Sequence, residues 1–187
     1  MEFRTTSLSG VYLIIPKVMG DHRGYFMEFF LKEQFEQNIG TINFVQENES
    51  FSTRGVLRGL HLQRGTHSQA KLIRCVSGSF VDVVVDLRAG SPTYGQTFVT
   101  VLSAENKHQL FVPRGFAHGF LVTSDTAIAQ YKVDNAYSPQ SECSVRYDDE
   151  DLAIDWEGYG VSKPEFKLSD KDLKGIPFRE FCPEPVL

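Results

Sequence analysis

Short apolar runs divided by turn-forming residues dominate the middle of this sequence. Runs rich in Val, Ile, Leu and Phe recur at near-regular spacing between Gly, Pro, Ser and Asn, with few helical periods among them. This spacing is typical of an antiparallel sandwich or barrel. The pattern predicts strands over residues 11–15, 25–31, 42–50, 56–63, 71–76, 79–87, 97–102, 109–112, 120–123 and 127–133.

The clearest period of two lies between residues 80 and 87. One set of alternate positions holds only Val and Leu, whereas the other set contains Asp82 and Asp86. A strand with this pattern has one wholly apolar face.

Helical character is confined to the ends of the chain. Residues 32–38 form the one convincing helical stretch of the first half, closed by Gly40, and residues 169–174 hold a shorter possibility. After Trp156 the chain is rich in proline, which suggests segments lying over the barrel or at a subunit contact. The prolines concerned are Pro164, Pro177, Pro183 and Pro185.

Composition narrows the class of protein. The 187 residues suit a single domain over residues 1–187, and 41% hydrophobic with 23% charged residues is the composition of a soluble globular protein. The formal net charge of -5 argues against a general binder of nucleic acids or membrane surfaces. An anionic ligand must therefore meet a local cluster of Arg and Lys.

Cysteine usage and the N-terminus both indicate the cytoplasm. Cys75, Cys143 and Cys182 are an odd number of cysteines at wide spacing, as expected in a reducing compartment. The sequence contains neither a secretion signal nor an apolar stretch long enough to span a membrane.

The segment from residue 55 to residue 78 has the spacing of the first cupin motif. Gly55, His61, Lys71 and Gly78 occupy the motif positions, and Gln63 stands where a second histidine is usual. The acidic residue of the motif is replaced by Lys71.

A second stretch, from Pro113 to His118, has the P-x-G-x-x-H pattern of the second cupin motif. Metal-binding cupins draw three histidines and a glutamate from the two motifs, whereas this chain retains only His61 and His118. The ammonium group of Lys71 would repel a divalent cation. We therefore expect a pocket without a metal, used for acid and base chemistry.

Taken singly, the candidate side chains have ordinary structural interpretations. A strand histidine such as His61 is more often structural than catalytic, and Lys71 reads as a solvated lysine at a sheet edge. Tyr131 alone is an aromatic strand residue, and Asp172 alone is a charge at the start of a helix. His118 could be a ligand, a hydrogen-bond donor or a core residue, and the donor role is favoured beside Lys71.

Six ordered strings change this assessment, because together they closely resemble the dTDP-4-dehydrorhamnose 3,5-epimerase family of cupins. The resemblance runs from about Leu13 to Asp172. The strings are VLRGLHLQ, KLIRCVSG, LSAENK, VPRGFAHGF, YKVDNAYSP and LAIDW.

The resemblance implies an all-β cupin jelly-roll barrel with a few short peripheral helices and an epimerase that needs no cofactor. It would invert C3 and C5 of dTDP-4-dehydro-6-deoxy-D-glucose on the route to dTDP-L-rhamnose, as a homodimer. By this likeness His61 is the base, Asp172 its paired carboxylate and Tyr131 the acid, with Lys71 stabilising the enolate. The positions that match substrate-binding residues are Arg23, Glu28, Gln46, Asn48, Arg58, His118, Glu142 and Lys171.

The residue types suit this chemistry on their own terms. Inverting a carbon next to a ketone needs a base on one face, an acid on the other, and a donor for the enolate oxygen. Arg23, Arg58 and Lys171 would meet a diphosphate through charge-assisted hydrogen bonds. Ala136 stands where many relatives carry an aromatic residue, so a base-stacking surface would have to come from Tyr25, Phe26 or Tyr137.

Three alternatives remain open at this stage. An epimerase that inverts only C3 or C5 would keep both His61 and Tyr131. A metal-dependent cupin oxygenase would use His61 and His118, and Gln63 and Lys71 argue against it. A sugar-nucleotide sensor without turnover would keep the pocket, but it would not need a complete acid and base set.

Overall fold

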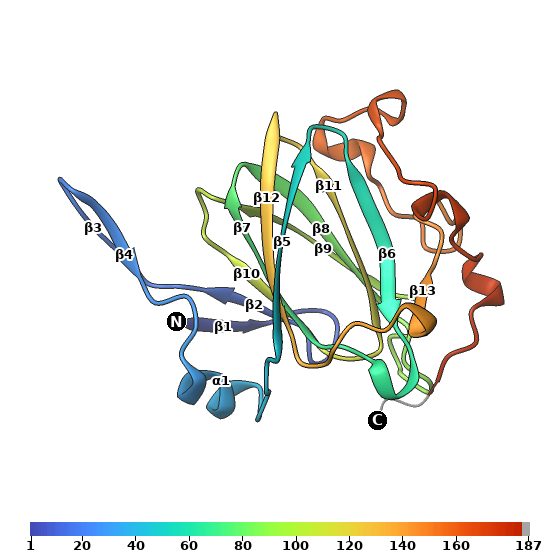
Figure 1. The fold of residues 1–187 in the computed structure, drawn as a ribbon, viewed down its shortest axis with the longest axis horizontal. Helices are drawn as coiled ribbons and strands as arrows, with labels where there is room; N and C mark the ends of the chain where they lie inside the picture. Colours follow the sequence, from blue (N-terminus) through green and yellow to red (C-terminus); the bar gives the residue numbers. More distant parts are fainter. Residues whose placement is uncertain (185–187) are drawn as a thin grey trace.

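Two antiparallel sheets face each other and form a barrel (Figure 1). The structure is a computed structural model, and it describes residues 1–184. The six-stranded sheet has the order β1-β2-β10-β7-β12-β5, and the five-stranded sheet has the order β13-β6-β11-β8-β9. This is the antiparallel jelly-roll barrel that the sequence predicted.

The elements have the following bounds. The first sheet contains β1 (Glu2–Thr5), β2 (Tyr12–Ile15), β10 (Gln109–Val112), β7 (Lys71–Ser77), β12 (Thr126–Val133) and β5 (Gln46–Thr53). The second sheet contains β13 (Glu142–Ser144), β6 (Leu57–Gln63), β11 (Phe116–Val122), β8 (Ser79–Asp86) and β9 (Thr97–Ser103). A separate hairpin consists of β3 (Val18–Asp21) and β4 (Gly24–Met27), and the α-helix is α1 (Lys32–Asn38). The short 3-10 helices are η1 (Gly65–His67), η2 (Pro139–Ser141), η3 (Glu157–Tyr159), η4 (Lys163–Glu165), η5 (Asp172–Lys174) and η6 (Phe178–Glu180).

Most predicted strands lie within a few residues of the observed ones, and the differences occur where pairing outweighs local sequence. The strand predicted over 120–123 is the longer β11, which begins directly after the turn that ends at Gly115. The strand predicted over 42–50 begins only at Gln46, because residues before it do not join the sheet. Strands β1, β3 and β13 carry no apolar run and were not predicted.

Strand β8 has the apolar face that its alternating sequence predicted. Val81, Val83, Val85 and Leu87 all pack into one core cluster on the outer side of the five-stranded sheet. The opposite face of β8 points between the two sheets, where Phe80 and Val84 join a second cluster. Asp82 and Asp86 share that inner face, and both are fully buried.

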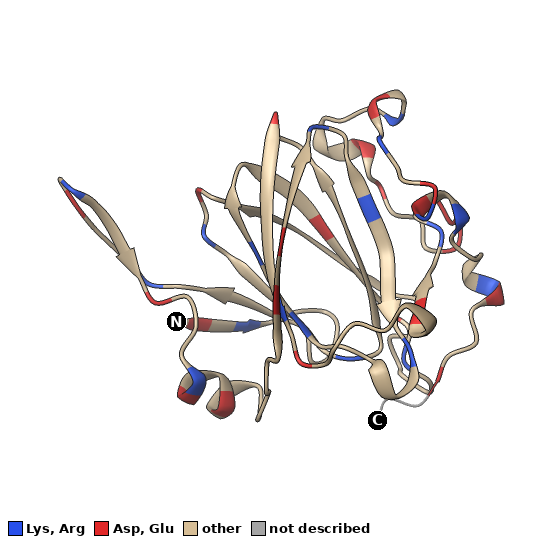
Figure 2. Ribbon diagram, in the orientation of Figure 1, with Lys and Arg blue, Asp and Glu red and all other residues tan. Residues whose placement is uncertain are grey.

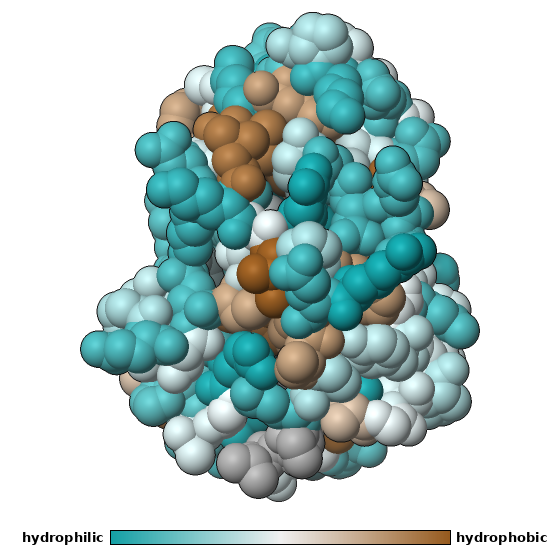
Figure 3. All heavy atoms as spheres, turned by 90° about the vertical axis from the view of Figure 1, so that its right-hand side faces the viewer, coloured by the Kyte–Doolittle hydropathy of each residue, from teal (hydrophilic) through white to brown (hydrophobic). Residues whose placement is uncertain are grey.

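The C-terminal segments cover the outer face of the five-stranded sheet, as the prolines suggested (Figure 1). Trp156, Val161 and Phe181 are buried against that face. Seen from this side, apolar residues surface only in separate patches among hydrophilic ones (Figure 3). Pro185 lies outside the described residues.

Helix α1 covers part of the other sheet and occupies the predicted residues. Phe35 is its buried anchor, and it packs with Phe30, Phe44 and Phe111 in a third cluster. No helix in the described part of the chain is long and apolar enough to cross a membrane.

The hairpin β3–β4 projects away from the barrel (Figure 1). It carries exposed large apolar side chains, with Met19 48% and Phe26 63% accessible. The hairpin is fastened at Tyr25, whose hydroxyl accepts a hydrogen bond from Lys107 Nζ at 2.9 Å.

Candidate active site

A cavity of about 450 Å³ opens between the two sheets. This volume lies in the usual range for small-molecule sites. Figure 2 shows charged residues spread mainly over the connections, the hairpin and the C-terminal segments, with few on the barrel strands. Several of the charged residues on the barrel strands line the cavity. Its walls consist of Gln46, Asn48, Ser50, Arg58, His61, Leu62, Gln63, Gln69, Lys71, Ile73, His118, Phe120, Ala129, Tyr131, Tyr137, Glu142 and Lys171.

The two histidines enter the cavity from neighbouring strands. His61 on β6 is the register partner of His118 on β11, and the register shifts between His118 and Phe120. The two backbones approach closely here, since a Cβ on Gly119 would lie 2.7 Å from the Arg58 carbonyl oxygen. Glycine at position 119 therefore lets these strands bring both imidazoles to one cavity.

A buried carboxylate supports His61 from behind. The Nε2 atom of His61 lies 2.7 Å from Asp172 Oδ1, and the Asp172 side chain is only 4% exposed. Asp172 also accepts hydrogen bonds from the backbone N–H of Gly59 and from Ser169. Burial favours a higher pKa for Asp172, but the close His61 imidazole and the hydrogen bonds from Ser169 and Gly59 outweigh burial and hold the pKa well below its ordinary value.

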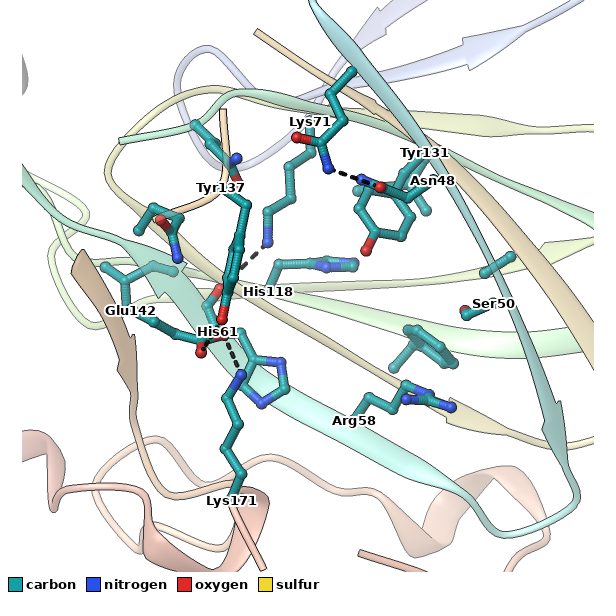
Figure 4. A pocket seen from close by; sticks show the side chains of 17 residues that line it. Asn48, Ser50, Arg58, His61, Lys71, His118, Tyr131, Tyr137, Glu142 and Lys171 are labelled. Carbon is teal, nitrogen blue, oxygen red and sulfur yellow. Dashed lines mark hydrogen bonds and ion pairs between the residues drawn. The ribbon is translucent and has the colours of Figure 1, made fainter. Parts of the chain in front are cut away.

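Tyr131 faces the cavity from the other sheet. It lies on β12, opposite Asn48 of β5 and Ile73 of β7. Figure 4 shows its hydroxyl pointing into the cavity that His61 and His118 also line. Burial raises the pKa of the Tyr131 phenol, and the charge of Arg58 only partly opposes this effect. The phenol is therefore protonated at neutral pH.

Lys71 reaches the cavity from β7. Its Nζ lies 3.4 Å from the backbone oxygen of His61 (Figure 4). Burial lowers the pKa of Lys71 to about 8, while the charges of Asp82 and Glu142 act in the opposite direction. At neutral pH the side chain remains an ammonium group, and it is available to an anionic oxygen in the cavity.

A second imidazole–carboxylate pair lies deeper in the barrel. Nε2 of His118 is hydrogen-bonded to Asp82 Oδ2 at 2.8 Å, and Asp82 is fully buried on β8. Asp82 was not among the site residues predicted from sequence. Its one signal there was an acidic residue among the apolar residues of the strand, a signal that it shares with Asp86.

A cluster of polar residues lies at one end of the cavity. Glu142 on β13 contacts Lys171 Nζ and accepts a hydrogen bond from the Tyr137 hydroxyl at 2.8 Å (Figure 4). Tyr137 is half exposed. Gln46 donates a hydrogen bond to Asn48 on β5, and the Arg58 side chain bonds Ser52.

The structure brings together ten of the predicted site residues and leaves two apart. The ten either line the cavity or, in the case of Asp172, support His61. Arg23 sits at the tip of the hairpin, where it is 79% exposed and pairs with Asp21. Glu28 directly follows the hairpin, and neither residue lines the cavity.

Several wall residues were missed from the sequence. Ser50, Gln69 and Ala129 carry no motif, and their positions follow only from strand register and loop geometry. Gln63 stands at a motif position, and its side-chain oxygen accepts a hydrogen bond from the Ser138 backbone N–H at 2.9 Å. It therefore fixes the loop that carries Tyr137.

The donor set does not suit a metal ion. Lys71 presents an ammonium group where a cupin metal site has a carboxylate, and the side-chain oxygen of Gln63 is already engaged by the backbone. Within residues 1–184, no group of three or more His, Cys, Asp or Glu side chains is arranged to hold a metal.

A two-sheet barrel that holds an imidazole–carboxylate pair and a phenol around one cavity is a cupin-type barrel suited to proton transfer. Residues 5–180 match the family model described as dTDP-4-dehydrorhamnose 3,5-epimerase. The chain belongs to the dTDP-4-dehydrorhamnose 3,5-epimerase family, and the epimerase class expected from the sequence is confirmed.

Individual relatives agree over nearly the whole chain. The dTDP-4-dehydrorhamnose 3,5-epimerase of Escherichia coli (strain K12) is 49% identical over 157 residues, which are 83% of this chain and 85% of that protein. The crystal structure of the same enzyme from Elizabethkingia anophelis is 49% identical, with a TM-score of 0.91 over 96% of this chain and 97% of that one.

A third relative carries a bound sugar nucleotide. It is the dTDP-6-deoxy-D-glucose-3,5-epimerase of Legionella pneumophila Philadelphia 1 in complex with dTDP-4-keto-L-rhamnose. Its sequence is 42% identical, with a TM-score of 0.91 over 97% of this chain and 94% of that one. These relatives are 3,5-epimerases, which supports the double inversion predicted from sequence rather than a single one.

Proposed function

We propose that this chain inverts C3 and C5 of dTDP-4-dehydro-6-deoxy-D-glucose to give dTDP-4-dehydro-L-rhamnose, using His61 as base and Tyr131 as acid. The observation that carries the assignment is the 2.7 Å contact between His61 and buried Asp172, in a cavity that also receives the Tyr131 hydroxyl. This arrangement supplies a base and an acid from different sheets, as inversion requires.

The first step is removal of a carbon-bound proton. Nε2 of His61 contacts Asp172, so Nδ1 is the ring nitrogen that accepts the proton from the carbon beside the ketone. The C–H electron pair forms a C=C bond to C4, and the π electrons of the C4 carbonyl move onto its oxygen, which becomes the enolate oxygen. Asp172 stabilises the imidazolium that results, because its low pKa keeps the carboxylate charged.

The second step returns a proton to the opposite face of the same carbon. Tyr131 donates its phenolic proton and the enolate collapses to the ketone. The phenolate then regains a proton from solvent, and the His61 imidazolium releases its proton to solvent. The same two steps at the second carbon complete the double inversion. Between the steps Lys71 holds the enolate oxygen, a contribution worth about 3 to 4 kcal/mol for a single donor in other enzymes.

The nucleotide end of the substrate fits the cluster of polar residues formed by Glu142 and Lys171 beside Tyr137. Lys171 and Arg58 offer positive charge to the diphosphate, and Gln46, Asn48, His118 and Glu142 offer hydrogen-bonding groups. Tyr137 supplies an exposed ring against which thymine can stack, which removes the need for an aromatic residue at Ala136.

We propose a homodimer, which explains why Arg23 and Glu28 lie outside the cavity of their own chain. The projecting hairpin exposes Met19 and Phe26 and carries Arg23 at its tip, so a second copy of the chain is needed to bury it. In this arrangement the hairpin of one copy brings Arg23 and Glu28 to the cavity of the other. The free edge strand β5, whose own Phe51 is 61% exposed, offers a surface for that contact.

We infer that the enzyme works in the cytoplasm. Cys75, Cys143 and Cys182 are all free thiols in the described chain. A nucleotide-linked sugar made in the cell is the substrate, and no disulfide among these residues is required for the fold.

Solvent exchange tests the proposal directly. The pure protein is incubated with the 4-keto sugar nucleotide in heavy water, and deuterium at C3 and C5 is read by NMR. Wild-type protein should label both carbons, whereas His61→Ala should lose exchange by at least about 10³-fold while dTDP binding by calorimetry changes little.

The matched control is His108→Ala, because His108 lies in a connection outside the cavity. It should exchange at the wild-type rate. Label at one carbon only would indicate a single-carbon epimerase, and unchanged exchange in His61→Ala would refute the assignment of the base.

A further inference from the structure

The carboxylate of Asp82 is buried in the barrel, and only one of its two oxygens accepts a hydrogen bond. Asp82 is 0% exposed, and its Oδ2 accepts a hydrogen bond from His118 at 2.8 Å. Its Oδ1 is also buried and has no hydrogen-bond partner among the described residues. A buried carboxylate oxygen without a donor costs stability, so its retention calls for an explanation.

Asp86 provides an instructive contrast on the same strand. It is equally buried on the same face of β8, but its oxygens accept bonds from Arg88, Ser91 and Thr93. That carboxylate is satisfied by its own loop and lies outside the cavity. Asp82 lacks such neighbours, and the groups it faces belong to the cavity wall.

The hydrogen bond to Asp82 determines how His118 is presented. A carboxylate only accepts hydrogen bonds, so the proton in this contact is on Nε2 of His118. Among the described residues Asp82 is the hydrogen-bond partner of this ring, which leaves Nδ1 for a ligand in the cavity. Loss of Asp82 would free the imidazole to rotate.

The negative charge of Asp82 also acts on Lys71. Among the charges that affect Lys71, that of Asp82 is the strongest, and it opposes the effect of burial on the lysine pKa. Other charged or titratable groups around Lys71 come from the neighbouring elements. They are Arg58 and His61 on β6, His118 on β11, Tyr131 on β12, Glu142 on β13, and Lys171 and Asp172 in the C-terminal segment.

We propose that Asp82 is a positioning residue for the epimerisation, which holds His118 through Nε2 so that Nδ1 faces the cavity beside the Lys71 ammonium group. This inference rests on the proposed function, because it takes the Lys71 ammonium to be the group that holds the enolate. It explains why an acidic residue interrupts the apolar interior at this point. The energetic cost of its unpaired oxygen is offset by a cation that would otherwise lose its proton in a dry cavity.

The test is the pH dependence of kcat/KM in Asp82→Asn. The amide keeps the shape of the side chain and can still accept from His118, but it removes the charge. We expect the alkaline fall of kcat/KM to move down by about one pH unit, with activity at pH 7.5 reduced by about 3-fold and activity well above pH 8 reduced by about 10-fold. Asp82→Glu, which keeps the charge but displaces it, should lower kcat while leaving the alkaline fall close to its wild-type position.

Asp86→Asn is the matched control, since it removes an equally buried charge from the same strand face. It should lower the unfolding midpoint without moving the pH profile. If Asp82→Asn does not fold, Asp82→Ser serves the same test with a smaller neutral side chain. An unmoved alkaline fall in the neutral variant, or an equal shift in Asp86→Asn, would overturn the inference. A wild-type protein that exchanges no carbon-bound proton would instead refute the proposed function itself.

Discussion

The proposed acid and base are each set by their immediate surroundings rather than by residue type. His61 faces a carboxylate whose pKa is lowered by three donors, so a proton gained by the imidazole is stabilised. Tyr131 is kept protonated because burial raises its pKa. On an open surface strand His61 would lack this buried carboxylate, and the Tyr131 pKa would not be raised by burial.

Tyr131→Phe separates the two half-steps of inversion. The ring remains to fill the wall, but the proton donor is gone. We expect product formation to fall by about 10²- to 10³-fold, while wash-out of the C3 or C5 proton into heavy water falls by less than about 10-fold. Tyr147→Phe, a half-buried tyrosine outside the cavity, is the control. An equal loss of exchange and product in Tyr131→Phe would show that the phenol is not the acid.

The titration of Lys71 predicts how activity responds to alkaline pH. The pKa of Lys71 is lowered to about 8, so the ammonium form is present below that value and is lost above it. Because the enolate is stabilised only by the charged form, kcat/KM should decline as the pH rises through about 8. Lys71→Arg, whose side chain keeps its charge, should lose this decline even if its overall rate is lower. A wild-type profile that stays level to pH 10 would rule out this role for Lys71.

At the scale of elements, the site depends on how closely β6 and β11 approach. A Cβ at Gly119 would lie 2.7 Å from the Arg58 carbonyl oxygen and 3.0 Å from Gly59 Cα. These are backbone atoms of a paired strand, so they cannot move aside as a flexible side chain would. The separation of His61 and His118 is therefore fixed by a residue without a side chain.

Gly119→Ala should consequently destabilise the fold and disturb the site together. We expect a loss of about 1 to 3 kcal/mol in the free energy of unfolding, measured by urea denaturation, because overpacking must push the strands apart. Gly20→Ala is the comparison, since a Cβ there meets nothing closer than 3.5 Å. Its effect should stay within about 0.5 kcal/mol. Equal stability in the two variants would contradict the close approach of β6 and β11.

Prediction from sequence succeeded for elements whose own pattern decides them. The strands β8 and β10 and helix α1 were located within one residue, because a continuous apolar run or helical period marks each one. The short strands β3 and β13 were missed, because they are strands only by virtue of the neighbours with which they pair.

At the scale of the whole molecule, the hairpin β3–β4 is the feature that the isolated chain leaves unexplained. Its apolar side chains are exposed, although Lys107 holds the hairpin through Tyr25 near its tip. A face of this kind is normally buried by association. The proposed dimer would bury it and would bring Arg23 to a second cavity.

Phe26→Asp tests that arrangement. A charge at this position should convert the dimer to a monomer in sedimentation experiments, while circular dichroism shows an intact fold. The KM for the sugar nucleotide should rise by about 10-fold or more, and Arg23→Ala should raise it without dissociating the dimer. Val101→Asp, at an exposed apolar residue of β9, should change neither property. A wild-type protein that sediments as a monomer with full activity would refute the shared site.

The sequence by itself determined the fold class, the family and most of the residues around the cavity. It could do so because apolar alternation is decided locally, and because the two cupin motifs keep fixed spacing between His61, Lys71 and His118. The resemblance had already paired Asp172 with His61, whereas only the tertiary structure decided that Asp82 stands behind His118 and that Arg23 lies outside the cavity. The physical reason is that such contacts join residues far apart in the chain, where strand register and the path of the C-terminal segment, rather than local pattern, set the distance.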